Sequence, residues 1–256
     1  LQPAQRKMSE TSISMPHIKA VLIDLDDTLW PIVPVIVRAE TILFDWLVLN
    51  VPGVARQFSV ENLRARRMAL MKAEPRYAID LRALRHAVLV EAFIQCGENP
   101  ARVDDAMAIF NQARNAVTPF DDVHPALTRL RGRVTLGSVS NGVADLNAIG
   151  MAHYFDASIA AYQFGSAKPD PAIFHAACDA LKVAPAEAVY VGDDPVLDVE
   201  GAQNAGLRAV WMKRPELQPQ RAMPDHIRPD GVCSSLYELD RWLSERIMGA
   251  FTLPHY

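Results

Sequence analysis

The segment KAVLIDLDDTLW, residues 19–30, decides how this sequence is organised. It opens with a short apolar run that contains β-branched residues, and it continues into three aspartates. An uninterrupted apolar run of this length is typical of a strand buried on both faces, as in a parallel sheet. The segment therefore predicts a buried strand over Lys19–Leu25 with acidic side chains at its carboxyl end.

Similar apolar runs recur further along the chain. Strong strand candidates are Arg133–Val139, Ala188–Val191 and Leu207–Met212, and weaker ones are Ala157–Ala161 and Gly231–Ser234. Helical patterns separate the runs, and Leu236–Met248 has the pattern of a closing amphipathic helix. Alternation of strands and helices favours a parallel sheet covered by helices on both faces. The sequence predicts an α/β fold with a doubly wound parallel sheet.

The stretch between residues 31 and 119 carries no strand signal. Its patterns predict helices over Pro34–Leu49, Ser59–Ala73, Asp80–Gly97 and Asn99–Ala116. Asp80 and Asn99 are good helix N-caps, and Gly97 is a good C-terminal stop. A crossover this long is not a plain βαβ unit. We therefore expect a helical cap domain at residues 31–119, inserted into a core domain of residues 18–30 and 120–256, with an N-terminal tail at residues 1–17.

Polar side chains follow several of the predicted strands. Asp24 and Asp26 follow the first strand, Ser140 and Asn141 the second, and Asp193 and Asp194 the third, while Lys168 opens the helix before the third. Open parallel sheets bind ligands beyond the carboxyl ends of their strands, so these groups are expected to converge. Carboxylates gathered in one place need a cation or protons, and an oxygen-rich site suits Mg²⁺.

Four motifs also resemble those of a known family. DLDDTLW (residues 24–30), SNG (140–142), KPDP (168–171) and GDDPVLD (192–198) resemble, in order and spacing, the motifs of the haloacid dehalogenase-like hydrolases. The resemblance covers residues 18–213 and implies a Rossmann-like core. The spacing between the first two motifs is similar to that of the subgroup with a helical cap inserted there. Residues 25–40, 74–77 and 192–206 further resemble bacterial phosphatases that act on flavin mononucleotide or on a phosphorylated pyrimidine of riboflavin synthesis.

The resemblance implies a role for each matching residue. Asp24 would be the nucleophile that attacks phosphorus, and Asp26 the general acid that protonates the leaving alkoxide and later takes a proton from water. The phosphate-contacting residues would be Thr28, Ser140, Asn141 and Lys168. The Mg²⁺ ligands would be the carboxylates of Asp24 and Asp193 and the backbone carbonyl of Asp26. Asp194 and Asp198 would position the metal's waters or Lys168, although both are equally compatible with capping the following helix.

The resemblance implies a Mg²⁺-dependent phosphatase of a small phosphorylated metabolite. An acid at Asp26 disfavours a haloacid dehalogenase, because a departing halide needs no proton. A phosphomutase and a non-catalytic phosphate-binding protein remain alternatives. In the cap, a solvated helix face is the expected place for a group of polar residues that would otherwise be candidate substrate contacts: Arg38, Arg76, Tyr77, Arg82 and Arg85.

The amino-acid composition restricts the kinds of partner and the compartment that we expect for this protein. The 256 residues contain 26 Lys and Arg against 30 Asp and Glu, a formal net charge of −4, which argues against nucleic acid. No apolar run approaches the length of about 18 residues that a membrane span needs. Cys96, Cys178 and Cys233 are far apart in the sequence, which indicates free thiols in a reducing cytoplasm. The sequence leaves the oligomeric state open.

Overall fold

The computed structural model describes residues 17–248, so most of the tail expected at residues 1–17 lies outside the described residues. Six parallel strands form one sheet in the order β3-β2-β1-β4-β5-β6. The strands are β1 (Ala20–Ile23), β2 (Thr135–Ser140), β3 (Ala157–Ala160), β4 (Ala188–Gly192), β5 (Arg208–Met212) and β6 (Gly231–Cys233). Because the chain starts in the middle and winds outward both ways, the doubly wound α/β fold is confirmed, including both weak strands.

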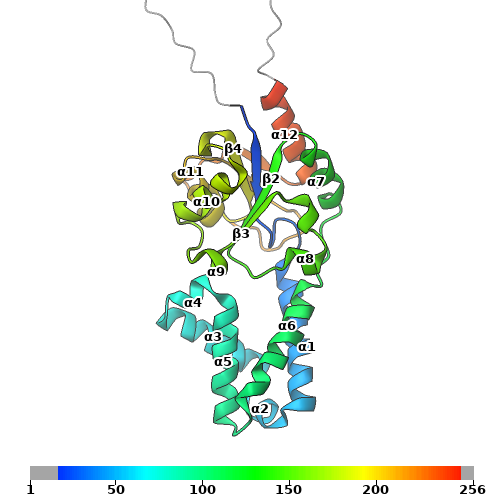
Figure 1. Cartoon of the computed structure of the whole chain (residues 1–256), viewed down its shortest axis with the longest axis vertical. Coiled ribbons are helices and arrows are strands. Elements are labelled where there is room, and N and C mark those ends of the chain that lie inside the picture. Colours follow the sequence, from blue (N-terminus) through cyan, green and yellow to red (C-terminus); the bar gives the residue numbers. More distant parts are fainter. Residues whose placement is uncertain (1–16, 249–256) are drawn as a thin grey trace, which may run out of the picture.

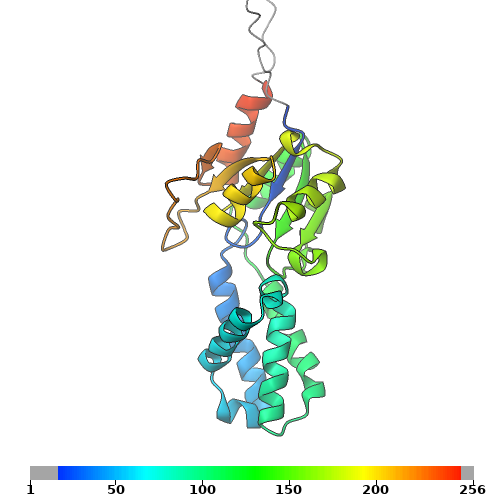
Figure 2. The ribbon, with the colours of Figure 1, turned by 90° about the vertical axis from the view of Figure 1, so that its left-hand side faces the viewer.

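Helices cover both faces of this sheet (Figures 1 and 2). One face packs against α7 (Val123–Arg131) and α12 (Leu236–Met248), and the other against α10 (Pro171–Leu181) and α11 (Gly201–Asn204). Alternate residues of β1 face opposite sides, so Val21 and Ile23 join the first apolar cluster whereas Ala20 and Leu22 join the second. Burial on both faces explains why β1 has no polar residue.

The remaining elements of the sheet domain are short. They are α8 (Leu146–Ile149), η2 (Ala152–Tyr154), α9 (Ala161–Phe164), η3 (Pro185–Glu187) and the π-helical turn η4 (Pro195–Glu200).

The chain between β1 and α7 forms a helical bundle, which we call the helical insert. It comprises α1 (Ile32–Asn50), α2 (Pro52–Gln57), α3 (Val60–Ala73), α4 (Arg76–Ile79), α5 (Leu81–Gln95), η1 (Pro100–Arg102) and α6 (Val103–Asn115). The insert has its own apolar cluster and lies beyond the carboxyl ends of the strands (Figures 1 and 2). Its position places helices over the edge of the sheet where the polar residues follow the strands.

Local capping explains where the helices of the insert begin. The Asp80 side chain accepts hydrogen bonds from two backbone N–H groups at the start of α5, and Asn99 accepts one at the start of η1. Gly97 has a φ of +70°, as expected of a residue that ends a helix. The short helices α2 and α4 were not expected, because four to six residues are too few to establish a helical period.

The expectation that the polar residues of the insert lie on solvated faces is wrong for Tyr77 and Arg85, which are buried. The Arg85 guanidinium lies 3.5 Å from the centre of the Phe110 ring and 3.6 Å from a carboxylate oxygen of Glu40. Burial lowers the pKa of Arg85 to about 9. The buried Glu40 carboxylate on α1 therefore pairs with arginines in the interior of the insert. The helical period of the sequence does not indicate such pairs.

Within the described part of the chain, no helix has both the length and the apolar character needed to cross a membrane.

Candidate active site

The loop after β1 fixes the direction of the first two aspartates. Asp24 continues the sheet, because its backbone N–H donates to the Val191 carbonyl of β4 at 2.9 Å. Asp27 then turns the chain with a φ of +64°, a conformation that aspartate tolerates better than most residues. The Asp27 carboxylate accepts a hydrogen bond from the Ile32 N–H at the start of α1. The loop therefore joins the sheet rigidly to the helical insert.

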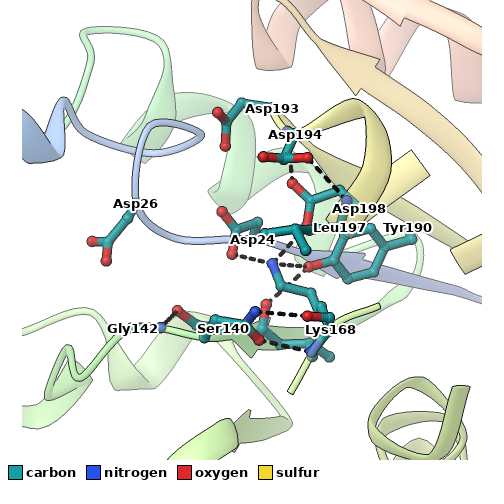
Figure 3. Close-up of polar contacts among 12 residues, drawn as sticks. Asp24, Asp26, Ser140, Gly142, Lys168, Tyr190, Asp193, Asp194, Leu197 and Asp198 are labelled. Atoms are coloured by element: carbon teal, nitrogen blue, oxygen red, sulfur yellow. Dashed lines mark hydrogen bonds and ion pairs between the residues drawn. The ribbon is translucent and has the colours of Figure 1, made fainter. Parts of the chain in front are cut away.

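Lys168 lies at the centre of the site (Figure 3). Its Nζ donates to Asp24 Oδ1 and to Asp198 Oδ1, each at 2.6 Å, and to the Tyr190 hydroxyl at 2.8 Å. Lys168, Asp24, Asp198 and Tyr190 are all buried. One ammonium group thus neutralises part of the negative charge of two carboxylates that come from different segments of the chain.

Asn141 holds the loop that carries Lys168. The Asn141 side chain donates to the Lys168 carbonyl at 2.9 Å and accepts from the Lys168 N–H at 2.8 Å. Asp170 then caps α10 by accepting from the Ala172 N–H. The Asn141 side chain is therefore committed to this loop through both of its polar atoms.

Three carboxylates at the end of the sheet can meet one cation. Asp24, Asp193 and Asp198 each offer an oxygen, and the three oxygens lie within 4.8 Å of one another. Gly192 permits this approach, because a Cβ atom at that position would overlap the Asp198 carboxylate. The set differs from the ligands expected from sequence, since it contains Asp198 in addition to Asp24 and Asp193.

Burial shifts the acid–base properties of these groups. Burial raises the pKa of Asp24 well above its usual value, opposed by Lys168 and reinforced by Asp198 and Asp193. Burial and the nearby Asp198 likewise raise the pKa of Asp193 to about 7. Burial alone would lower the pKa of Lys168, but Asp198 and Asp24 outweigh that effect and keep the ammonium charged. The site has more negative charge than Lys168 balances.

Asp194 faces away from Lys168 (Figure 3). Its Oδ1 caps η4 by accepting from the N–H groups of Val196 and Leu197, both at 2.9 Å. Arg221, from the proline-rich loop after β5, bridges Asp194 and the Oδ2 of Asp193. The helix-cap role, which the sequence left open for both acids, is therefore the one that Asp194 performs, whereas Asp198 contacts Lys168.

The other residues expected in the site are placed around this centre. Ser140 is buried and its Oγ accepts from the Gly142 N–H at 2.9 Å. Thr28 is fully buried, and its hydroxyl has no hydrogen-bond partner among the described residues. Asp26 lies apart from Asp24 and Lys168 (Figure 3). Its carboxylate accepts hydrogen bonds from Trp30 and Arg114.

Sequence reasoning missed three residues at the site, namely Tyr190, Arg114 and Arg221. Tyr190 carried a signal, since it lies on a predicted strand two residues before the glycine of the fourth motif. Arg114 and Arg221 carried none, because they are 88 and 28 residues away from the acids that they contact, Asp26 and Asp193. Only the folded chain reveals these two contacts.

A cleft of about 410 Å³ opens beside Asp193. It runs between the start of α1, at Val33 and Pro34, and the loop that carries Arg221. Asp24 and Lys168 do not line it. The cleft therefore reaches the acidic cluster from the Asp193 side.

A comparison with protein-family models matches residues 18–206 to the haloacid dehalogenase-like hydrolases. The 5-amino-6-(5-phospho-D-ribitylamino)uracil phosphatase YigB of Escherichia coli is 32% identical over 204 residues, which cover 78% of this chain and 85% of that protein. A phosphoserine phosphatase of Thermus thermophilus is also 32% identical, over 81% of this chain and 94% of its own length.

Among solved structures, a 2-haloacid dehalogenase from Pseudomonas syringae pv. Tomato superposes with a TM-score of 0.81. It is 37% identical and the match covers 89% of this chain and 99% of that one. The similar proteins thus carry names of two kinds, phosphatases and dehalogenases.

Proposed function

Since this chain belongs to the haloacid dehalogenase-like hydrolases, as its four motifs predicted, we propose that it is a Mg²⁺-dependent phosphatase of a small phosphorylated metabolite. The observation that carries this proposal is the contact of 2.6 Å between Lys168 Nζ and Asp24 Oδ1 at the carboxyl end of β1. A buried carboxylate oriented by an ammonium group is equipped to attack phosphorus, and the same cation attracts a phosphate dianion.

The first half-reaction forms an aspartyl-phosphate on Asp24. A carboxylate oxygen of Asp24 bonds to phosphorus while the bond between phosphorus and the ester oxygen breaks. Asp26 transfers its proton to the departing alkoxide, which leaves as the alcohol. Lys168 balances the charge that gathers on the phosphoryl oxygens, and the Ser140 hydroxyl would contact one of them.

The second half-reaction returns the enzyme to its starting state. Asp26, now ionised, takes a proton from a water molecule as the oxygen of that water bonds to phosphorus. The bond between phosphorus and Asp24 breaks, which releases inorganic phosphate and regenerates the carboxylate. One carboxyl group thus serves as acid and then as base.

The chemistry of the donor set supports Mg²⁺ as the cofactor. Oxygen atoms of Asp24, Asp193 and Asp198 lie within reach of one ion, and Mg²⁺ prefers carboxylate oxygens together with water and phosphate. The guanidinium of Arg221 already lies against Asp193, which indicates that a positive charge is favourable there. When bound, Mg²⁺ would polarise the phosphoryl group and offset the negative charge of the site.

A phosphatase is favoured over the dehalogenase named among the similar structures. The discriminating residue is Asp26, which gives the site a carboxyl group that can protonate an alkoxide. A halide leaves without a proton, so a dehalogenase has no use for that group. A phosphomutase would use the same residues and would reveal itself by requiring a sugar bisphosphate.

A substrate panel tests the proposed activity. It contains flavin mononucleotide, 5-amino-6-(5-phospho-D-ribitylamino)uracil, phosphoserine, several sugar phosphates, p-nitrophenyl phosphate and 2-chloropropionate, ranked by kcat/KM. The similarity to YigB leads us to place the phosphorylated pyrimidine or flavin mononucleotide first. Release of chloride with no release of phosphate would overturn the proposal.

Metal removal is expected to abolish turnover. Dialysis against EDTA should lower kcat by about 100-fold or more, because the charge of the acidic cluster is then left uncompensated. Added Mg²⁺ should restore activity and raise the melting temperature of the metal-free protein, since an ion that binds only the folded state stabilises it. Full activity in EDTA, with no change in melting temperature on adding Mg²⁺, would contradict the assignment.

The affinity for Mg²⁺ is expected to fall below pH 7. In the metal-free protein the pKa of Asp193 is raised to about 7, so this carboxyl takes up a proton as the pH falls through that value. Because the ion binds the ionised carboxylate, each pH unit below 7 should weaken the apparent affinity by about tenfold, with little change above pH 8. Isothermal titration calorimetry at pH 8, 7 and 6 measures this trend. Equal affinities at pH 8 and pH 6 would contradict it.

A further inference from the structure

The Asp26 carboxylate is held by two buried side chains. Its Oδ1 accepts a hydrogen bond from Trp30 Nε1 at 2.8 Å. Nη2 of Arg114 donates to both carboxylate oxygens, at 2.7 and 2.8 Å. Trp30 and Arg114 are almost completely buried, with 0% and 1% of their surface exposed. The Asp26 side chain is therefore held by three hydrogen bonds.

The two partners of Asp26 come from the two connections between the sheet and the helical insert. Trp30 lies two residues before the start of α1, and Arg114 lies in the last turn of α6. The ends of α1 and α6 are themselves joined, because Arg38 donates to the carbonyls of Ala113 and Ala116. The position of the insert and the position of the Asp26 carboxylate are therefore set by the same two helix ends.

Arg114 also reaches the phosphate side of the site. A Cβ atom at Gly142 would overlap Asp26 Oδ2, and it would lie 3.2 Å from Ser140 Oγ and 3.5 Å from Arg114 Nη2. These three groups therefore surround one glycine. The Nε and Nη1 atoms of Arg114 are buried without a hydrogen-bond partner among the described residues. A buried guanidinium with so few partners is costly, which argues that its contact with Asp26 serves the reaction rather than stability.

We propose that Arg114 is a positioning residue for Asp26, an inference that rests on the phosphatase function proposed above. By donating to both carboxylate oxygens from the end of α6, Arg114 fixes the place of the Asp26 carboxyl group beside Ser140 and Gly142. A proton donor must lie within hydrogen-bond reach of its target, so a released side chain would lose most of its effect. Proton delivery to the leaving group thereby depends on how the insert is seated on the sheet.

The Arg114→Met variant tests this role through its dependence on the leaving group. We expect kcat/KM to fall by about 100-fold for an alkyl phosphate but by less than about fivefold for p-nitrophenyl phosphate, whose leaving group departs with little need of a proton. The value of kcat/KM is the right measure, because it reports the steps up to departure of the alcohol. A purely structural role for Arg114 would lower both values equally, and that result would overturn the proposal.

Matched variants separate this inference from its premises. Asp26→Asn should show the same selectivity to a greater degree, and Arg114→Lys should recover part of the loss because a single nitrogen makes the present contact. Arg38→Met loosens the same helix ends but leaves both donors to Asp26 in place, so it should show the same selectivity to a smaller degree than Arg114→Met. If Arg114→Met does not fold, Trp30→Phe removes the other donor and should give a smaller loss of the same selectivity; no selectivity in that variant would overturn the proposal.

Failure of the phosphatase proposal and failure of the Arg114 proposal give different results. A wild-type protein that hydrolyses no phosphate ester contradicts the phosphatase function itself. An active wild type in which Asp26→Asn is selective and Arg114→Met is not leaves the function standing and removes only the role of Arg114.

Discussion

The Asp24→Asn variant is expected to lose at least about 10⁴-fold in kcat on every phosphate ester, as single replacements of a catalytic nucleophile do. The amide cannot attack phosphorus, so the aspartyl-phosphate cannot form. The fold should survive, because the side-chain oxygen can still accept from Lys168, which keeps Asp198 as its counter-ion. Steady-state kinetics and circular dichroism measure both results.

A control from the same loop makes the Asp24→Asn result specific. Asp27→Asn keeps the side-chain oxygen that accepts from the Ile32 N–H and keeps a residue type that tolerates the φ of +64°. We therefore expect it to stay within about threefold of wild-type kcat, since asparagine and aspartate cap helices about equally well. Intact mass measurement excludes deamidation of the introduced asparagine back to aspartate. Full turnover by a pure Asp24→Asn protein would rule out Asp24 as the nucleophile.

Removal of the lysine is expected to damage both activity and stability. Lys168→Met would leave two buried carboxylates, Asp24 and Asp198, without the ammonium that joins them. We expect the free energy of unfolding of the metal-free protein at pH 8 to fall by about 3–5 kcal/mol, as it does when one partner of a buried ion pair is removed. Urea unfolding measures this change. The kcat should fall by about 10³-fold, because the phosphoryl charge loses its fixed counter-charge.

The pH dependence of the Lys168→Met defect identifies its cause. Burial raises the pKa of Asp24, so protonation of this acid relieves the repulsion as the pH falls. The stability deficit relative to wild type should therefore shrink at lower pH. Lys19→Met is the matched control, since the ion pair of Lys19 with Glu187 is largely exposed and its loss should change stability by at most about 0.5 kcal/mol. A deficit in Lys168→Met that is equally large at low pH would contradict this electrostatic explanation.

Most of the fold could be predicted from the sequence because its helices and strands have recognisable local patterns. Burial of β1 on both faces requires an unbroken apolar run, and such a run is visible without any knowledge of the partners of the strand. The Asp80 and Asn99 caps lie within three residues of the N–H groups that they satisfy, so they too can be read directly. The short helices α2 and α4 escaped prediction because they contain too few residues to reveal a period.

The same distinction between local and long-range features applies to the candidate site. The sequence by itself determined the aspartates after β1, the lysine before α10 and the acids after β4, because each follows or precedes a recognisable element and parallel strands bring their carboxyl ends to one edge. Only the tertiary structure decided the partners: Arg114 on Asp26, Arg221 on Asp193, and Asp198 rather than Asp194 on Lys168. Charged side chains pair across any sequence separation once folding brings them together. Their contacts depend on the packing of helix ends and loops, which no local pattern records.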